Sequence, residues 1–169
     1  MKTIFLTGKP RCGKSFIVNE IVQTLQKKDM KVGGILTPDI REDHERTGFH
    51  IIDIASSTKE ILASKHLKEG PRIGPYRINV EGIDLITEKF LESLESFDII
   101  IIDELGVMEL KSEKFKKMLD QVLKSSQPKL IILNRHLVKH YEKHGEVIEM
   151  KREIADEVKK KILKEIVNL

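Results

Sequence analysis

A loop near the N-terminus combines two glycines with a lysine and a serine at fixed spacing. The loop fits the pattern G-x-x-x-x-G-K-[ST], and its residues are Gly8, Lys9, Pro10, Arg11, Cys12, Gly13, Lys14 and Ser15, followed by Phe16. The apolar run before it predicts a strand, and the apolar spacing after it predicts a helix. Backbone N–H groups of such a loop, with those of the first helical turn, can surround phosphate oxygens. Residues 8–16 are therefore predicted to bind a nucleotide, with Lys14 on the β- and γ-phosphates and Ser15 on Mg²⁺. A plain helix-capping turn is the alternative.

Two carboxylates, Asp103 and Glu104, directly follow the four isoleucines 99–102. Such a run predicts a parallel strand buried on both faces, with Asp103 at its carboxyl end, where open α/β sheets bind ligands. We expect Asp103 to hold Mg²⁺ through a water, opposite Ser15, in the Walker B role. Glu104 is expected to polarise the water that attacks a γ-phosphate. A solvated loop position is the alternative for Glu104.

Further polar side chains lie where they can reach the same edge of the sheet. Asn134 ends the strand expected at 129–133. It can sense the γ-phosphate if that strand lies beside the P-loop strand, and a plain turn residue is equally compatible.

The adjacent Arg135 is a candidate for stabilising charge in the transition state. Arg41, Arg46 and Arg72 lie in polar, breaker-rich segments and are further candidates for phosphate or base contacts. The sequence selects none of these three.

Three histidines, His136, His140 and His144, are spaced four residues apart. On a regular helix this spacing places them on one face, where neighbouring pairs can chelate Zn²⁺. No HExxH pattern accompanies them, and the helix dipole offers a simpler reason for a histidine near a helix C-terminus. Zinc binding therefore stays a minor hypothesis.

Apolar runs and helical patterns alternate along the rest of the chain. Strands are expected at 3–7, 31–38, 49–54, 60–64, 76–80, 99–102, 129–133 and 147–150, and helices at 16–25, 81–94, 113–124, 137–144 and 153–167. The polar segment 39–48 is expected to be a hairpin tip or a mobile loop, and 69–75 a second loop. The strands at 49–54 and 60–64 are close in sequence, which predicts an antiparallel pair joined by a turn at 56–58. The sheet is therefore expected to be mixed.

Length and composition favour a single globular domain. The chain has 169 residues, with Lys+Arg 30 against Asp+Glu 27 and a net charge of +3. One domain over 1–169 is expected, and the mixed charges argue against nucleic acid as the main partner. Cys12 is the only cysteine, so no internal disulfide is possible. No targeting segment is visible, and no apolar run approaches the roughly 20 residues that span a bilayer. We expect a soluble, cytoplasmic protein without a membrane partner.

Taken together, these motifs resemble those of the THEP-type nucleoside-triphosphatases, a family that includes the cancer-related nucleoside-triphosphatase of animals. The resemblance rests on the segments 7–15, 33–42, 46–49, 72–76 and 103–110. The first is the Walker A loop, and the last is similar to the family's extended Walker B run Asp-Glu-Ile-Gly-x-Met-Glu-Leu. The likeness extends to about residue 136. The chain departs from the family where a His-Arg-Arg-like run is common, because it has Asn134, Arg135 and His136 there.

The resemblance implies a fold and an activity. The fold is a three-layer, RecA-like α/β P-loop domain with a mostly parallel central sheet and antiparallel additions. The activity is slow, Mg²⁺-dependent hydrolysis of ATP, GTP and other nucleoside triphosphates, with broad base specificity.

A nucleotide or small-molecule kinase, with lids near 41–48 and 72–74, is the main alternative, and Glu104 argues against it. A nucleotide-controlled regulatory switch is a third possibility, while the lack of an Asn-Lys-x-Asp motif argues against a guanine-specific GTPase.

Overall fold

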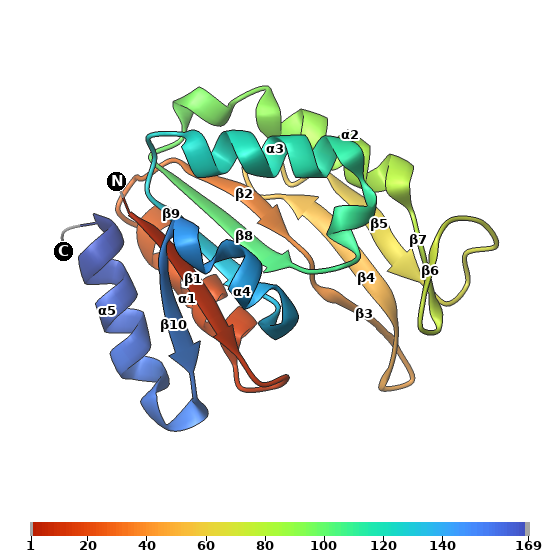
Figure 1. Ribbon diagram of the computed structural model, residues 1–169, viewed down its shortest axis with the longest axis horizontal. Coiled ribbons are helices and arrows are strands. Elements are labelled where there is room, and N and C mark those ends of the chain that lie inside the picture. The colour runs from red at the N-terminus through yellow and green to blue at the C-terminus, as the bar shows by residue number, and fades with distance from the viewer. Residues whose placement is uncertain (1, 168–169) are drawn as a thin grey trace.

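The computed structural model describes residues 2–167 and has one mixed sheet with helices on both of its faces (Figure 1). One half of the sheet is parallel. Its strands are β1 (Thr3–Gly8), β2 (Val32–Leu36), β8 (Ile99–Leu105), β9 (Lys129–Leu133) and β10 (Glu146–Met150). They lie in the order β10-β1-β9-β8-β2, so β9 separates the P-loop strand from the strand of the two carboxylates. This places Asn134 between the two motifs, as its proposed sensing role requires.

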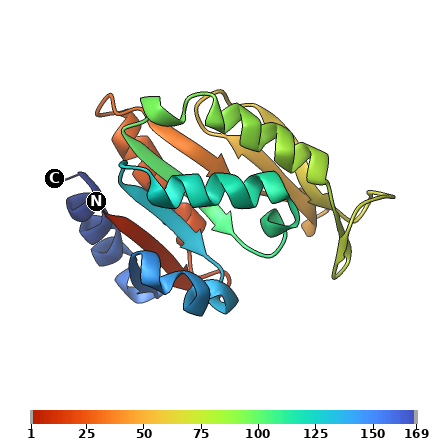
Figure 2. The ribbon, with the colours of Figure 1, turned by 45° about the horizontal axis from the view of Figure 1, so that its top comes forward.

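The parallel strands are buried on both faces because two sets of helices cover them. One face carries α1 (Lys14–Gln26) and α5 (Ala155–Val167), and the other carries α2 (Val80–Leu91), α3 (Glu113–Lys124) and α4 (Val138–Tyr141). Figure 2 shows α2 and α3 side by side across the sheet. Successive strand residues point to opposite faces of the sheet and pack into the two cores in turn, as expected from the two-residue period of a strand. Ile99 and Ile101 pack toward α1, whereas Ile100 and Ile102 pack toward α2 and α3.

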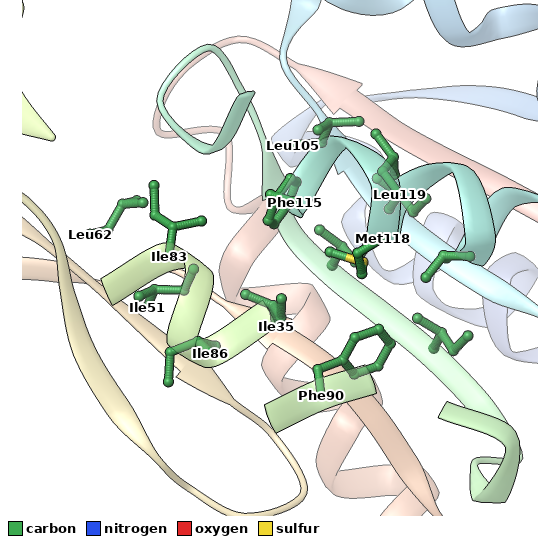
Figure 3. Close-up of a cluster of buried hydrophobic side chains, with 14 of the residues drawn as sticks. Ile35, Ile51, Leu62, Ile83, Ile86, Phe90, Leu105, Phe115, Met118 and Leu119 are labelled. Carbon is green, nitrogen blue, oxygen red and sulfur yellow. The ribbon is translucent and has the colours of Figure 1, made fainter. Parts of the chain in front are cut away.

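The core under α2 and α3 reaches from the parallel half of the sheet into the antiparallel half. Figure 3 shows Ile83, Ile86 and Phe90 of α2 beside Phe115 of α3, with Ile51 from the antiparallel half in the same cluster. All five side chains are fully buried. Their packing fixes the carboxyl end of β8 relative to the antiparallel strands.

The antiparallel half extends the sheet beyond β2. It consists of β4 (Glu45–Asp53), β5 (Lys59–Ser64), β7 (Tyr76–Ile78) and β6 (Arg72–Ile73), with β3 (Asp39–Glu42) paired to β4. The predicted antiparallel pair with its turn at 56–58 is present, because the Asp53 N–H donates to the Thr58 carbonyl at 3.0 Å. Within the described residues the whole sheet has ten strands.

Two polar segments form hairpins: 39–48, which was expected to be a hairpin tip or a mobile loop, and 69–75, which was expected to be a loop. Most of the polar segment 39–48 forms β3 and the start of β4, and only Asp43 and His44 form its tip, with φ of 47° and 67°. The segment 69–75 contains β6, which pairs with β7 around Gly74. The β3–β4 and β6–β7 hairpins extend past the helices (Figure 1). Their side chains are polar because much of their surface faces water.

Other boundaries also differ from the prediction. β8 continues to Leu105, two residues beyond Asp103, because it regains pairing with β9 after a register shift. The helix expected at 81–94 ends at Leu91, before a separate 3₁₀ turn at 94–96. The helix expected at 137–144 is only α4, flanked by 3₁₀ turns at 135–137 and 142–144. The last helix, expected from 153, begins at Ala155.

Between residues 2 and 167, none of the helices has both the length and the apolar character to cross a bilayer.

Candidate active site

The P-loop connects β1 to α1, and its backbone demands glycine at both ends. Gly8 has a φ of +151°, and a β-carbon there would lie 2.6 Å from the Met150 carbonyl oxygen of β10. Gly13, with a φ of +97°, is the residue that precedes α1. Both conformations are open to glycine and strained for other residues. Lys14 donates from Nζ to the carbonyl oxygens of Gly8 at 3.0 Å and Lys9 at 2.9 Å, so its ammonium group lies across the loop.

Asp103 lies within β8 as a buried carboxyl group facing the P-loop. It is only 7% exposed. Burial raises the pKa of Asp103 to about 7; the Ser15 hydroxyl and the Lys14 charge lower it, and the Glu104 charge raises it further. Folding removes water from the Asp103 carboxylate, and the interactions with Ser15 and Lys14 offset only part of the hydration free energy that is lost. Asp103 and Ser15 thus line the same cavity and lie near each other, as the Walker A and Walker B patterns predict.

Glu104 is fixed by two neighbouring residues. The Thr37 hydroxyl donates to the Asp103 carbonyl at 2.8 Å and accepts from the Glu104 N–H at 3.0 Å, which ties β8 to the end of β2. Asn134 donates from Nδ2 to Glu104 Oε1 at 3.3 Å. Asn134 also accepts from the His136 N–H at 3.1 Å, so its amide is oriented by the turn that follows β9. The carboxylate of Glu104 therefore has a defined direction.

Glu109 is a third carboxyl group at this edge, and it is almost completely buried. It is 4% exposed, and its Oε2 accepts from the Gly106 N–H at 3.0 Å. Burial raises the pKa of Glu109 to about 8, and the charges of Glu104 and Asp103 add to the rise. At neutral pH Glu109 is therefore mostly protonated, and it holds the loop after β8 without adding a full negative charge to the site.

These groups line one cavity of about 530 Å³. The predicted residues in its wall are Gly8, Pro10, Arg11, Gly13, Lys14, Ser15, Phe16, Asp103, Glu104, Asn134 and Arg135. The wall formed by the described residues does not include Lys9 or Cys12, and Cys12 packs instead against the core under α1 and α5. Arg41 and Arg46 reach the cavity from the β3–β4 hairpin. Arg72 lies outside it, on β6, because that hairpin projects away from the P-loop.

Several residues of the cavity were not predicted from the sequence. They are Thr37, Asp39, Phe49, Leu62, Gly106, Val107, Met108, Glu109, Leu133 and His136. The sequence held one signal for part of this set, because the family-like segments 33–42, 46–49 and 103–110 contain most of them. The physical role of Glu109 follows from its burial.

The three histidines are not grouped as three ligands of one metal ion. His136 lies in the cavity wall, whereas His140 and His144 contact the Tyr141 ring, with ring centres 4.8 Å and 6.4 Å apart. A regular helix covers only residues 138–141, so the expected shared helical face does not exist. Across residues 2–167, no three His, Cys, Asp or Glu side chains are grouped so that they could hold a metal ion.

Comparison with known proteins identifies the family. The model of a family described as NTPase matches residues 3–163. The chain belongs to this NTPase family. As a member of the family, it is a nucleoside-triphosphate hydrolase.

Relatives match this NTPase over nearly its full length. The nucleoside-triphosphatase THEP1 of Methanocaldococcus jannaschii is 38% identical over 166 residues, covering 95% of this chain and 96% of the relative. The protein of the same name from Pyrococcus abyssi is 39% identical over 164 residues, covering 96% of this chain and 90% of the relative. These matches confirm the resemblance inferred from the motifs.

Solved structures confirm the fold of the NTPase. The crystal structure of THEP1 from the hyperthermophile Aquifex aeolicus has a TM-score of 0.82 at 29% identity, covering 98% of this chain and 99% of that chain. The solution structure of a human cancer-related nucleoside triphosphatase has a TM-score of 0.78 at 24% identity, covering 99% and 98%, a likeness of fold. The predicted three-layer arrangement, with a parallel central part of the sheet and antiparallel additions, is therefore correct.

Proposed function

We propose that this NTPase hydrolyses ATP, GTP and other nucleoside triphosphates to the diphosphate and phosphate, with Mg²⁺ and with Glu104 as the residue that orients the attacking water. The observation that carries the proposal is the placement of Glu104. It follows Asp103 in the cavity wall, and one of its oxygens accepts from the Asn134 amide at 3.3 Å. The second carboxylate oxygen is then left for a water molecule.

The residues beside the P-loop suit a magnesium ion. Mg²⁺ prefers hard oxygen ligands and usually keeps several waters, with one or two protein groups beside the phosphate oxygens. Asp103 and Ser15 supply a carboxylate and a hydroxyl next to each other. A cation would favour the ionised form of Asp103, whose pKa burial has raised to about 7. When bound, the ion would neutralise charge on the β- and γ-phosphates.

The residues of the chain have separate tasks in the proposed reaction. The loop N–H groups and Lys14 bind the phosphates. Glu104 orients the water and accepts its proton while the water oxygen bonds to the γ-phosphorus and the bond to the bridging oxygen breaks. Asn134 fixes the Glu104 carboxylate, and Thr37 fixes its backbone. The diphosphate leaves with the electron pair of the broken bond.

Broad base use and slow turnover are supported by the exposed rim of the cavity. Phe16, directly after the P-loop serine, is 66% exposed and lines the cavity. An aromatic ring can stack on any base, because every base has a π-face, and stacking contributes about 1–3 kcal/mol. Val107, 47% exposed, and the exposed Arg135 leave the rim open to water. Electrostatic stabilisation is weaker where water is not excluded, so we infer slow turnover.

Base use has a direct test. Phe16→Ala should raise KM for ATP, GTP, CTP and UTP by a similar factor, about tenfold, as loss of one stacking contact predicts. Phe16→Tyr keeps the ring and should keep all four values near wild type. An effect of Phe16→Ala on one nucleotide alone would contradict the role of a general stacking surface.

The activity is tested by phosphate release from the four triphosphates with Mg²⁺, in the absence and presence of a pool of nucleosides and nucleoside monophosphates. We expect phosphate from several triphosphates, no effect of the pool, and loss of turnover in Glu104→Gln. Glu113→Gln, an exposed carboxylate at the start of α3, is the matched control. Phosphorylated members of the pool with little free phosphate would instead identify a kinase.

A further inference from the structure

Two arginines reach the cavity from the β3–β4 hairpin, and one of them presents a free guanidinium end. Arg46 donates from Nε to Asp39 Oδ2 at 3.1 Å, and its guanidinium carbon lies 5.3 Å from the centre of the Phe49 ring. Neither terminal nitrogen of Arg46 donates a hydrogen bond to any residue between 2 and 167. The two terminal nitrogens of Arg46, which can donate to phosphoryl oxygens, are therefore available to a ligand.

A frame of three side chains holds this guanidinium group. Asp39 of β3 is the register partner of Phe49 of β4, so the two groups that contact Arg46 stand opposite each other in the hairpin. The Phe49 ring packs edge-on against Tyr76 of β7, with ring centres 5.3 Å apart. The contacts of Nε with Asp39 and of the guanidinium group with the Phe49 ring restrict the side chain before any ligand binds. Such restriction reduces the ordering entropy that binding would cost.

The other arginines of the cavity lack this arrangement. Arg41 uses both terminal nitrogens, donating from Nη1 to the His44 carbonyl at 3.2 Å and from Nη2 to Asp39 Oδ2 at 3.0 Å. Arg41 therefore closes the hairpin tip. Arg11 and Arg135, which also line the cavity, are exposed, and neither side chain forms a hydrogen bond with the residues from 2 to 167. An unrestrained side chain must be ordered each time that it contacts a phosphate.

We propose that Arg46 contacts the γ-phosphoryl group in the transition state and neutralises the charge that develops there, so that the chain supplies its own arginine finger. The inference rests on the proposed hydrolysis. Arg46 lines the same cavity as Lys14 and Glu104, and its planar pair of terminal nitrogens matches two phosphoryl oxygens. Asp39 and Phe49 act through Arg46 and are positioning residues.

Kinetics of substituted proteins test the assignment. Arg46→Ala should lower kcat on the order of 100-fold and change KM less than about threefold, because the contact strengthens only in the transition state. Arg46→Lys keeps the charge but loses the planar pair of donors, so it should recover little of kcat. Arg72→Ala is the matched control, since Arg72 also donates from Nε, to the Gly74 carbonyl at 3.2 Å, but lies outside the cavity. Wild-type kcat in Arg46→Ala, or a larger loss in Arg135→Ala, would overturn the proposal.

Binding of a transition-state analogue gives an independent readout. A fluorescent ADP should bind the wild type more tightly when Mg²⁺ and aluminium fluoride are added. Arg46→Ala should bind the ADP alone as well as wild type, which also shows that it folds, and should lose most of the gain from aluminium fluoride. Introduced alone, Asp39→Ala should lower kcat. Combined with Arg46→Ala, it should cause no further loss. A full gain from aluminium fluoride in Arg46→Ala would refute the inference.

Failure of this inference differs from failure of the proposed function. If the wild type releases no phosphate from any triphosphate, the proposed hydrolysis is wrong and the role of Arg46 in it is overturned as well. If the wild type and Arg46→Ala release phosphate equally fast, while Glu104→Gln does not, only the role of Arg46 is wrong.

Discussion

The buried carboxyl group of Glu109 should make the stability of the fold depend on pH. In the folded protein burial raises the pKa of Glu109 from an ordinary 4.5 to about 8. In the unfolded chain the group ionises near the ordinary value. Between these two values the folded state holds a proton that the unfolded state has released. The free energy of unfolding should therefore fall as pH rises through this window.

The size of the effect follows from the same two pKa values. The difference, 8 − 4.5, is about 3.5 units, and each unit corresponds to about 1.4 kcal/mol, so the total is about 5 kcal/mol. Between pH 5 and pH 7, ionisation of Glu109 in the unfolded chain should lower the free energy of unfolding by about 2–3 kcal/mol. Urea unfolding curves at several pH values in this range would measure it.

Two variants isolate the contribution of Glu109. Glu109→Gln keeps a side-chain oxygen that can accept from the Gly106 N–H but cannot ionise, so its stability should fall much less with pH. Glu113→Gln, an exposed carboxylate on the following helix, should keep the pH dependence of the wild type. Asp103, whose pKa burial raises to about 7, adds its own dependence to all three proteins, so the comparison is between slopes. Equal slopes in the wild type and Glu109→Gln would show that Glu109 does not cause the pH dependence.

Two further predictions concern the P-loop and the start of α3. Lys14→Ala should lose both nucleotide affinity and turnover, because it removes the cation that lies across the P-loop; titration with a fluorescent ATP would check this, and wild-type affinity would contradict it. Ser112→Ala should lower the unfolding free energy by about 1–2 kcal/mol. The Ser112 hydroxyl accepts from the Phe115 N–H at 3.0 Å and donates to Asp84, and both bonds are lost. Unchanged urea unfolding of Ser112→Ala would show that the cap is dispensable.

The centre of the site could be predicted because its signals are local in sequence. The two P-loop glycines, Lys14 and Ser15 follow from a strand–loop–helix pattern within a few residues. Asp103 and Glu104 follow from an apolar run whose length is typical of a buried parallel strand. The position of Asn134 between the motifs required a further assumption about strand order, which the topology bears out.

The rest of the site could not be predicted, for physical reasons. A glutamate is rarely buried, so the sequence gives no reason to place Glu109 in the interior; its burial results from packing of the loop after β8. Segment 39–48 lacks alternating apolar residues because little of it faces the core, so its sequence could not decide between a hairpin tip and a mobile loop. The free end of Arg46 depends on Asp39 and Phe49, which only the hairpin register brings to it.

In the proposed reaction, water oriented by Glu104 attacks the γ-phosphate. Hydrolysis of ATP in ¹⁸O-labelled water tests this step, with the mass of the released phosphate measured for the wild type, Glu104→Gln and Glu113→Gln. We predict one ¹⁸O atom in the phosphate from the wild type and Glu113→Gln, and binding of ATP without turnover in Glu104→Gln. Phosphate without ¹⁸O from a single turnover, or wild-type turnover in Glu104→Gln, would contradict the account.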